Sequence, residues 1–191
     1  MAFDLVVRGG EVIDGTGGQP FRADVAIHGD RIVAVGQFQD AEAGRVIDAS
    51  GMVVAPGFID VHNHSDGWLL KEKNFQCKTL QGFSTEVLMA DGISYAPVDR
   101  DNWREWIHYL RPLNGLSLQD YDGWETLGDY MQRLDGRTAQ NVATHVPYAN
   151  IRALVNGFGS RPIDDSQAVR IRRLIEREMD AGAVGLSTGL D

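Results

Sequence analysis

The stretch that decides the fold runs Val54-Ala55-Pro56-Gly57-Phe58-Ile59-Asp60-Val61-His62-Asn63-His64. Its apolar run follows a Pro-Gly entry and ends at His62, as expected for a short buried strand. Alternate side chains of a strand share a face, so we expect His62 and His64 to point the same way from its C-terminal end. Two imidazoles in that arrangement can bind one divalent ion, with zinc the first candidate. The alternative is two surface histidines in a loop, and the apolar strand with its Pro-Gly entry favours the metal site.

The sequence after Gly57 alternates short apolar runs with helical patterns. Four runs are expected as strands: Phe58–Val61, Thr85–Met89, Val142–Val146 and Ala183–Leu186. Two apolar helical faces lie between them, one with Trp103, Trp106, Ile107 and Leu110 and one with Trp124, Leu127, Met131 and Leu134. A third helix follows Asp164, which has capping-box spacing to Gln167, and Gly182 is its natural stop. The arginines of this helix are expected on a solvated outer face.

This alternation predicts parallel βα units. Four units of about 34 residues suit half of a (β/α)₈ barrel of ~250 residues. The first 57 residues instead contain short strands separated by glycine turns, with a hairpin turn at Gly29-Asp30. These strands are expected at Phe3–Arg8, Glu11–Asp14, Ala23–His28, Arg31–Val35, Val46–Ile47 and Met52–Val54.

The predicted fold is therefore α/β, in two parts. Residues 1–57 form part of a small N-terminal β-sandwich, a layer too thin to close a sandwich by itself. Residues 58–191 form the first half, strands 1 to 4, of a metal-dependent (β/α)₈ TIM-type barrel.

Composition excludes several classes of protein. The chain has 191 residues, of which 43% are hydrophobic and 24% charged, as in globular proteins rather than disordered, collagen-like or coiled-coil chains. No apolar run approaches the ~20 residues of a membrane-spanning helix. The net charge of −9 argues against a nucleic-acid surface. The N-terminus lacks a signal-peptide pattern, and the single cysteine, Cys77, fits a reducing compartment. We therefore expect a cytoplasmic protein that binds neither nucleic acid nor membrane.

The motifs resemble those of a known family. Pro56–His64 is similar to the strand-1 signature of the amidohydrolase superfamily, and Gly9–Gly15 resembles the start of that superfamily. Three further stretches resemble the N-acyl-D-amino-acid deacylase (D-aminoacylase) branch: Gln81–Val87, Asp91–Pro97 and Gly182–Leu190. The resemblance covers essentially all of the chain but only the N-terminal portion of that family.

The resemblance implies a metal-dependent hydrolase of linear amides, that is, of C–N bonds other than peptide bonds. Its substrate would be a small N-acyl-D-amino acid, and its cofactor one or two Zn²⁺ ions or other divalent metals. The remaining half of the barrel would be needed for a closed fold.

The resemblance also implies a ligand set. His62 and His64 match the family's strand-1 metal ligands, and the next family ligand is a cysteine in an Asn-Cys-Gly stretch. The matching residue here is Asp91, in Ala90-Asp91-Gly92. A carboxylate can ligate or bridge zinc, so we expect Asp91 to be the third ligand, with an altered metal preference because it is harder than a thiolate. Cys77 does not match, and we expect it to be a small buried residue.

Other residues are expected near the site. The family's Val-Gly-His stretch appears as Val146-Pro147-Tyr148, so we expect Tyr148 to contact substrate. His145 either approaches the site or packs elsewhere. Ser187 is expected on the polar lip of the fourth strand, in contact with substrate. Asp66 either orients an imidazole or faces water.

No catalytic residue is expected within this chain. The resembling family places its general base, an aspartate, at the end of strand 8 and two more histidine ligands after strands 5 and 6, all beyond Asp191. One alternative is therefore a truncated, non-catalytic fragment of such an enzyme.

Two other enzyme classes are disfavoured. A cyclic amidase of the dihydroorotase or hydantoinase type bridges two metals with a carboxylated lysine, but the only lysines, Lys71, Lys73 and Lys78, follow strand 1. The run Gly185–Gly189 matches the serine-hydrolase elbow Gly-x-Ser-x-Gly. No acid and histidine follow that run to complete a triad.

Overall fold

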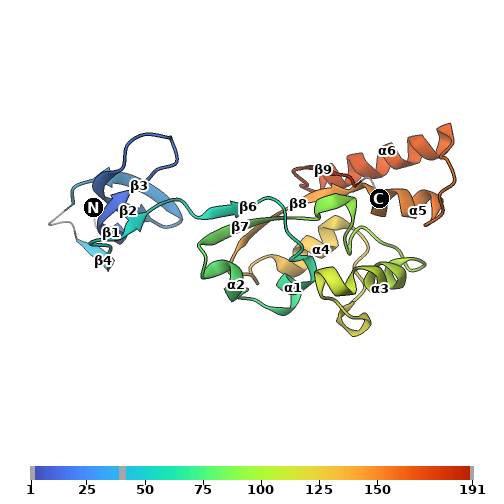
Figure 1. Ribbon diagram of the computed structural model, residues 1–191, viewed down its shortest axis with the longest axis horizontal. Helices are drawn as coiled ribbons and strands as arrows, with labels where there is room; N and C mark the ends of the chain where they lie inside the picture. The colour runs from blue at the N-terminus through green and yellow to red at the C-terminus, as the bar shows by residue number, and fades with distance from the viewer. Residues whose placement is uncertain (1–2, 39–41, 190–191) are drawn as a thin grey trace. The chain divides into compact units, whose positions relative to one another are not determined.

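The computed structural model describes residues 3–38 and 42–189. The chain divides into two compact units, Met1–Pro56 and Gly57–Asp191 (Figure 1). This division lies one residue before the predicted boundary. Leu190, the last residue of the predicted Gly182–Leu190 stretch, lies outside the described residues.

The first unit is a five-stranded mixed sheet with the order β3-β2-β1-β4, in which β5 also pairs with β1. The strands β1 and β2 and the strands β2 and β3 are antiparallel, whereas β4 and β5 run parallel to β1. A two-residue turn at Gly29-Asp30 joins β2 to β3, as predicted. The strands are β1 (Phe3–Val12), β2 (Phe21–His28), β3 (Arg31–Gly36), β4 (Ala43–Asp48) and β5 (Val53–Val54).

One long strand, β1, replaces the two strands predicted on either side of Gly9-Gly10. The register with β2 shifts between Val7 and Gly10, so the glycines form an irregularity within the strand rather than a turn. Gly9 has a φ of +74°, and its N–H donates to the buried Asp24 carboxylate at 2.8 Å. The separate strand predicted at Glu11–Asp14 is therefore wrong.

The second unit contains a four-stranded parallel sheet with the order β6-β7-β8-β9. Its strands are β6 (Phe58–Asp60), β7 (Phe83–Leu88), β8 (Asn141–Pro147) and β9 (Gly185–Ser187), each overlapping a predicted strand. Sequential order, parallel direction and intervening helices are the arrangement of consecutive barrel strands. The sheet is therefore consistent with the predicted part of a barrel. Because all four strands are parallel, their C-terminal ends meet at one edge.

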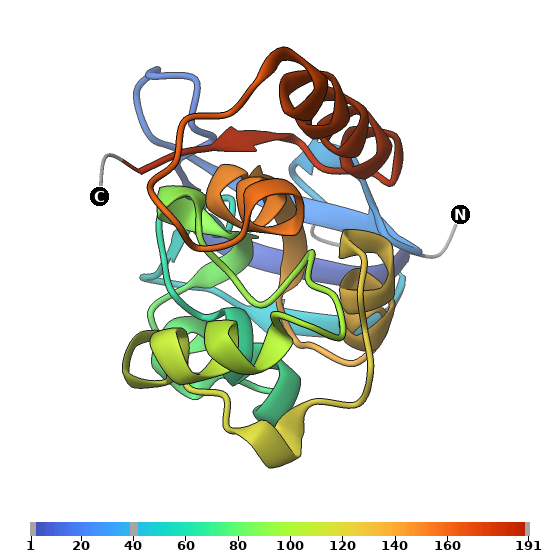
Figure 2. The same cartoon turned by 90° about the vertical axis from the view of Figure 1, so that its right-hand side faces the viewer.

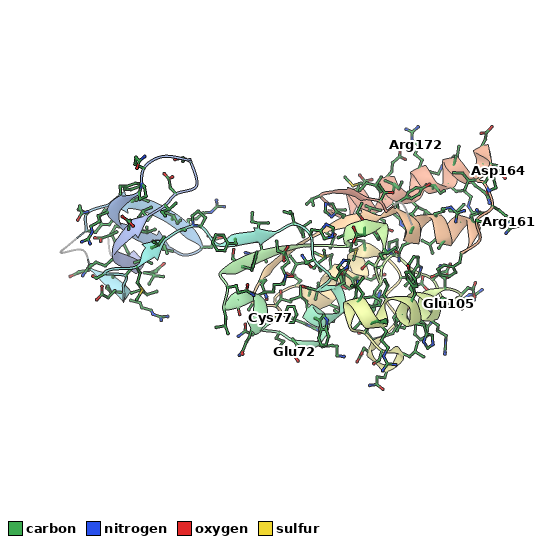
Figure 3. All side chains as sticks on the ribbon, viewed as in Figure 1. Glu72, Cys77, Glu105, Arg161, Asp164 and Arg172 are labelled. Carbon is green, nitrogen blue, oxygen red and sulfur yellow. The ribbon has the colours of Figure 1, made fainter. Side chains whose placement is uncertain are left out.

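Helices connect these strands (Figures 1 and 2). They are α1 (Asp66–Lys71), α2 (Gln76–Thr79), α3 (Trp103–Asn114), α4 (Leu127–Leu134), α5 (Tyr148–Asn156) and α6 (Asp165–Asp180), with 3₁₀ turns η1 (Ala90–Gly92) and η2 (Leu118–Asp120). The predicted capping box of Asp164 and Gln167 is confirmed at the start of α6, and Gly182 follows its end with a φ of +109°. Arg172 pairs with Glu176 on the exposed face of this helix, as expected (Figure 3).

Two helical predictions need correction. Trp124 precedes α4 instead of lying on it, because its indole N–H donates to Tyr95 O at 2.8 Å and holds the chain outside the helix. The helix α5 was not predicted. It begins directly after Pro147, whose fixed φ suits a residue preceding a helix, and it buries Ile151.

The core of this unit lies between the sheet and its helices. Leu88 and Val146 from the strands pack with residues of α3, α4 and α5, of which Ile107, Leu127 and Ile151 are at most 2% exposed. A buried carboxylate, that of Glu178, links α6 to α4 by accepting the N–H of Leu127 at 2.9 Å. Across residues 3–38 and 42–189, no helix is long and apolar enough to cross a membrane.

Candidate metal centre

Three predicted ligands converge at the C-terminal edge of the parallel sheet. His62 and His64 follow β6, and Asp91 lies in η1, just after β7. The Asp91 Oδ2 atom is 3.4 Å from His62 Nε2 and 3.3 Å from His64 Nε2. One ligand atom from each residue lies within 4.8 Å of the other two. Within the described part of the chain, this is the one such cluster of three or more His, Cys, Asp or Glu residues.

The spacing of these atoms fits a metal better than a direct hydrogen bond. A charge-assisted N–H···O bond is about 2.7–2.9 Å long, shorter than both separations. Zinc bonds of about 2.1 Å in a tetrahedron instead place neighbouring ligand atoms about 3.4 Å apart. Two imidazole nitrogens and one carboxylate oxygen are also a donor set typical of zinc. The three residues therefore fit a divalent ion.

The histidine side of the site is fixed mainly by hydrogen bonds within residues 60–65, with further contacts to β7 and α2. The Asp60 carboxylate accepts the His62 N–H at 3.3 Å and pairs with Lys78 of α2. Asn63, between the two histidines, is 6% exposed, and its side-chain amide donates to Asp60 O and to Val87 O, each at 3.2 Å. Its side-chain oxygen accepts the Ser65 N–H at 3.1 Å. Asn63 thus ties the end of β6 to β7 and leaves the flanking imidazoles free to face Asp91.

The Asp91 side of the site has an unusual backbone. Met89 and Asp91 have φ values of +65° and +58°, in the left-handed region that residues other than glycine rarely adopt. Met89 N–H donates to the Asp66 carboxylate at 3.1 Å, and the Met89 side chain is fully buried. Such strained conformations cluster at functional sites, where the surrounding structure holds them.

Asp66 is the first residue of α1 and is fully buried, so the alternative of an acid facing water is wrong. Its Oδ1 atom accepts the Ser94 hydroxyl at 2.5 Å as well as Met89 N–H. Burial raises the pKa of this carboxyl to about 6, against the opposing effects of Ser94 and of His64. Its Oδ2 atom has no hydrogen-bond partner among the described residues. Asp66 therefore supports the Asp91 turn through Met89.

Two other residues lie outside the cluster. Cys77 is exposed on α2, a four-residue helix with no buried residue, so the prediction that it is buried is wrong (Figure 3). His145 lies in β8 beside Gly185 and is not in the ligand cluster; its Nδ1 atom is buried and, in the described chain, has no hydrogen-bond partner. His145 is therefore not one of the three converging ligands, and its approach to the site stays a prediction.

The two residues expected to contact substrate differ in their surroundings. Tyr148 lines a cavity of about 610 Å³ that opens beside Asp91 between α3 and α5. Its wall is largely apolar and includes Ile93, Trp106, Tyr109, Ala149 and Phe158, with Glu105 and Arg152 as charged members (Figure 3 labels Glu105). Ser187 instead bonds to the chain: its hydroxyl donates to Met89 O at 2.5 Å and accepts the Gly92 N–H at 3.1 Å.

Asn150 is among the supporting residues that sequence reasoning missed. It is fully buried on α5, and its side chain accepts the Ser94 N–H at 2.9 Å and donates to Ser94 O at 2.7 Å. It thereby holds the segment after the Asp91 turn. A polar residue between the apolar residues Ala149 and Ile151 was the available signal, but its partner is 56 residues away in the sequence.

Comparison with known proteins identifies similar chains. The model of the amidohydrolase family matches residues 45–190. A D-aminoacylase of Alcaligenes xylosoxydans xylosoxydans is 39% identical, over 98% of this chain and 38% of its own length. An N-acyl-D-glutamate deacylase of the same organism is 38% identical, over 98% of this chain and 37% of its own length. The chain thus spans less than two fifths of the curated relatives it matches.

Solved structures agree with these similarities. A crystal structure of D-aminoacylase superimposes with a TM-score of 0.82 and 37% identity, over 98% of this chain and 38% of that one. The N-acyl-D-glutamate deacylase of Bordetella bronchiseptica gives a TM-score of 0.83 at 31% identity, over 100% of this chain and 39% of that one. That structure contains zinc and a phosphonate inhibitor that mimics the tetrahedral intermediate of its reaction.

Proposed function

The chain belongs to the amidohydrolase family, and from this premise we propose that it carries part of the metal site of an enzyme that deacylates N-acyl-D-amino acids. The observation that carries the proposal is the convergence of His62, His64 and Asp91 at the C-terminal edge of a parallel sheet. Active sites of (β/α)₈ enzymes are built at that edge. The similarity to deacylases of N-acyl-D-amino acids supports the substrate class.

His62, His64 and Asp91 would hold the metal, zinc being the first choice. The zinc in the similar Bordetella bronchiseptica structure supports that choice. When bound, such an ion polarises a substrate carbonyl and lowers the pKa of a water molecule. The imidazoles would supply nitrogen donors, and Asp91 would supply a carboxylate oxygen whose negative charge offsets one of the two positive charges of the ion.

Tyr148 and the cavity beside Asp91 would bind an apolar group next to the scissile amide. The cavity lies within the size range of small-molecule sites, and aromatic rings form much of its wall. Arg152, its one cationic residue, already donates to the backbone oxygens of Gly157 and Arg161. An apolar acyl or side-chain group therefore suits this cavity better than a carboxylate.

The proton transfers need a group that we place outside residues 1–191. Asp91 is engaged as a ligand in this proposal, and Asp66 is buried beneath the turn. An aspartate elsewhere in the barrel, as the family resemblance implies, would take a proton from water and return it to the leaving nitrogen.

The test is metal analysis combined with an acetate-release assay on the protein that includes the proposed base, called the parent protein below. The substrates are N-acetyl-D-leucine, N-acetyl-D-glutamate and N-acetyl-L-leucine. We expect turnover of the D-leucine derivative above the other two, and loss of both turnover and bound zinc in His62→Ala. His108→Ala, at an exposed histidine of α3, is the matched control and should change neither.

Failure of the parent protein to bind any divalent ion would contradict the proposal. Equal turnover of the two leucine enantiomers would remove the D preference alone. Residues 1–191 expressed without further sequence test the alternative of a non-catalytic fragment, which acetate release by that chain would exclude.

A further inference from the structure

The turn that presents Asp91 is held in place by a residue almost a hundred positions later in the sequence. Three of its residues, Met89, Asp91 and Gly92, have positive φ values of +65°, +58° and +77°. Two of the three are not glycines, so the turn has no intrinsic preference for this shape. Contacts from elsewhere in the fold must therefore maintain it.

Ser187, at the end of β9, makes two of those contacts. Its Oγ donates to Met89 O at 2.5 Å and accepts the Gly92 N–H at 3.1 Å, so one hydroxyl uses both its donor and its acceptor capacity. These two backbone groups flank Asp91 on either side. The hydroxyl thus fixes both ends of the segment that carries the carboxylate.

Close backbone packing brings Ser187 within reach of the turn. A Cβ atom on Gly92 would lie 2.8 Å from Thr188 Cα, and one on Gly189 would lie 2.6 Å from Asp91 O. Both distances are shorter than side chains tolerate. The two glycines therefore allow the end of β9 to approach the turn.

The opposite side of the turn is anchored separately. The buried Asp66 carboxylate accepts Met89 N–H at 3.1 Å, but it makes no hydrogen bond to Asp91 or Gly92 in the described structure. Ser187 is accordingly the side chain that bonds to both flanks of Asp91.

We propose that Ser187 is a positioning residue that sets the affinity of the metal site through Asp91. By bonding to Met89 O and Gly92 N–H it holds Asp91 Oδ2 at 3.4 and 3.3 Å from the imidazole nitrogens of His62 and His64. This inference rests on the proposed function, because it requires that the three residues bind a metal. It also makes the site depend on the docking of the fourth strand of the sheet.

The test measures the affinity of the full chain for Zn²⁺ and Co²⁺ by competition with a chromogenic chelator. We expect Ser187→Ala to weaken binding by about 10–100-fold, the usual cost of losing a group that orients a ligand. Ser187→Thr keeps the hydroxyl and should restore most of the affinity. Thr188→Ala removes the neighbouring hydroxyl, which among the described residues bonds to Gly189 O, and should leave the affinity unchanged.

A double-mutant cycle separates positioning from a general structural role. If Ser187 acts through Asp91, Ser187→Ala should have no further effect on affinity in an Asp91→Ala background. The Co²⁺ absorption spectrum should also change in Ser187→Ala as the carboxylate leaves the ion. Should Ser187→Ala fail to fold, Ser187→Cys makes the same test, because a thiol is a weaker donor and acceptor than the hydroxyl and should also weaken binding.

Two outcomes would overturn the inference while leaving the proposed function intact. One is undiminished affinity in Ser187→Ala, and the other is an equal loss in the presence and absence of the Asp91 carboxylate. Absence of metal binding by the parent protein would instead overturn the proposed function, and this inference with it.

Discussion

The two sides of the candidate metal centre are built in different ways. His62 and His64 are two residues apart in the segment that follows β6, and the hydrogen bonds of Asn63 between them hold that segment to β6 and β7. Asp91 depends on Asp66 from α1, on Ser187 from β9 and on the buried side chain of Met89. One side is local in the sequence, and the other is assembled from three elements.

This difference predicts how each side responds to change. The histidine side should tolerate most substitutions that spare the imidazoles, since the two histidines lie two residues apart in one short segment that the hydrogen bonds of Asn63 hold. The Asp91 side should be sensitive to substitutions that touch neither the carboxylate nor the imidazoles, because its backbone is held by contacts remote in the sequence.

Removing an imidazole should have the largest effect. In His64→Ala we expect the affinity for Zn²⁺ to fall by more than about 100-fold, since even groups that only orient a ligand cost about 10–100-fold. Equilibrium dialysis of the full chain against buffered Zn²⁺ measures this change. His108→Ala should bind Zn²⁺ as tightly as the unsubstituted protein. An unchanged affinity in His64→Ala would show that His64 is not a ligand of the site.

The buried carboxyl of Asp66 should make stability depend on pH. Its pKa is raised from 3.8 to about 6 by burial, so the folded state binds the proton more tightly than the unfolded state. The stability that protonation provides is complete below about pH 4 and is lost as the pH rises through 6, a fall of about 3 kcal/mol in the free energy of unfolding.

Asp66→Asn keeps an acceptor for Met89 N–H and Ser94 and should lack that fall. Denaturant unfolding of both proteins at several pH values, with a chelator present, gives the difference between their unfolding free energies. Between pH 4 and pH 7 the free energy of unfolding of Asp66→Asn should rise relative to that of the unsubstituted protein. A difference that does not change with pH would exclude the raised pKa.

Gly92→Ala tests the close approach of β9 to the turn. Its Cβ would meet Thr188 Cα at 2.8 Å, whereas a Cβ on Gly123, also at positive φ, would lie in open space. We expect Gly92→Ala to reduce the free energy of unfolding by about 1–3 kcal/mol more than Gly123→Ala does. Thermal and denaturant unfolding measure both variants. Equal losses would mean that the turn and β9 are not in tight contact.

Asn63→Ala should have the smallest effect, on the locally built side. It removes three hydrogen bonds but leaves the strand pairing of β6 with β7, so a loss of about 1–2 kcal/mol in stability is expected. Zn²⁺ affinity should fall by less than in Ser187→Ala. Asn74→Ala, at an exposed asparagine, is the control. A larger loss of Zn²⁺ affinity in Asn63→Ala than in Ser187→Ala would mean that the histidine side, and not the Asp91 side, is the more sensitive one.

Much of the fold could be predicted because its signals are local. Apolar runs marked all four strands of the parallel sheet, and the capping box of Asp164 and Gln167 marked α6. The Gly9-Gly10 pair misled the prediction, because glycine serves both turns and irregular strands and only the pairing with β2 distinguishes them. Cys77 was expected to be buried from its residue type, but α2 is too short to have a buried face.

The sequence by itself indicated that two histidines would lie together at the end of a strand, since they are two residues apart just after an apolar run; in the structure both follow β6 and neither belongs to it. It also marked Asp91 through its family resemblance. Only the tertiary structure decided what Ser187 and Asp66 do. Their partners in the Asp91 turn, Met89 and Gly92, lie 23 to 98 residues away and present backbone atoms, which carry no residue-specific signal in the sequence.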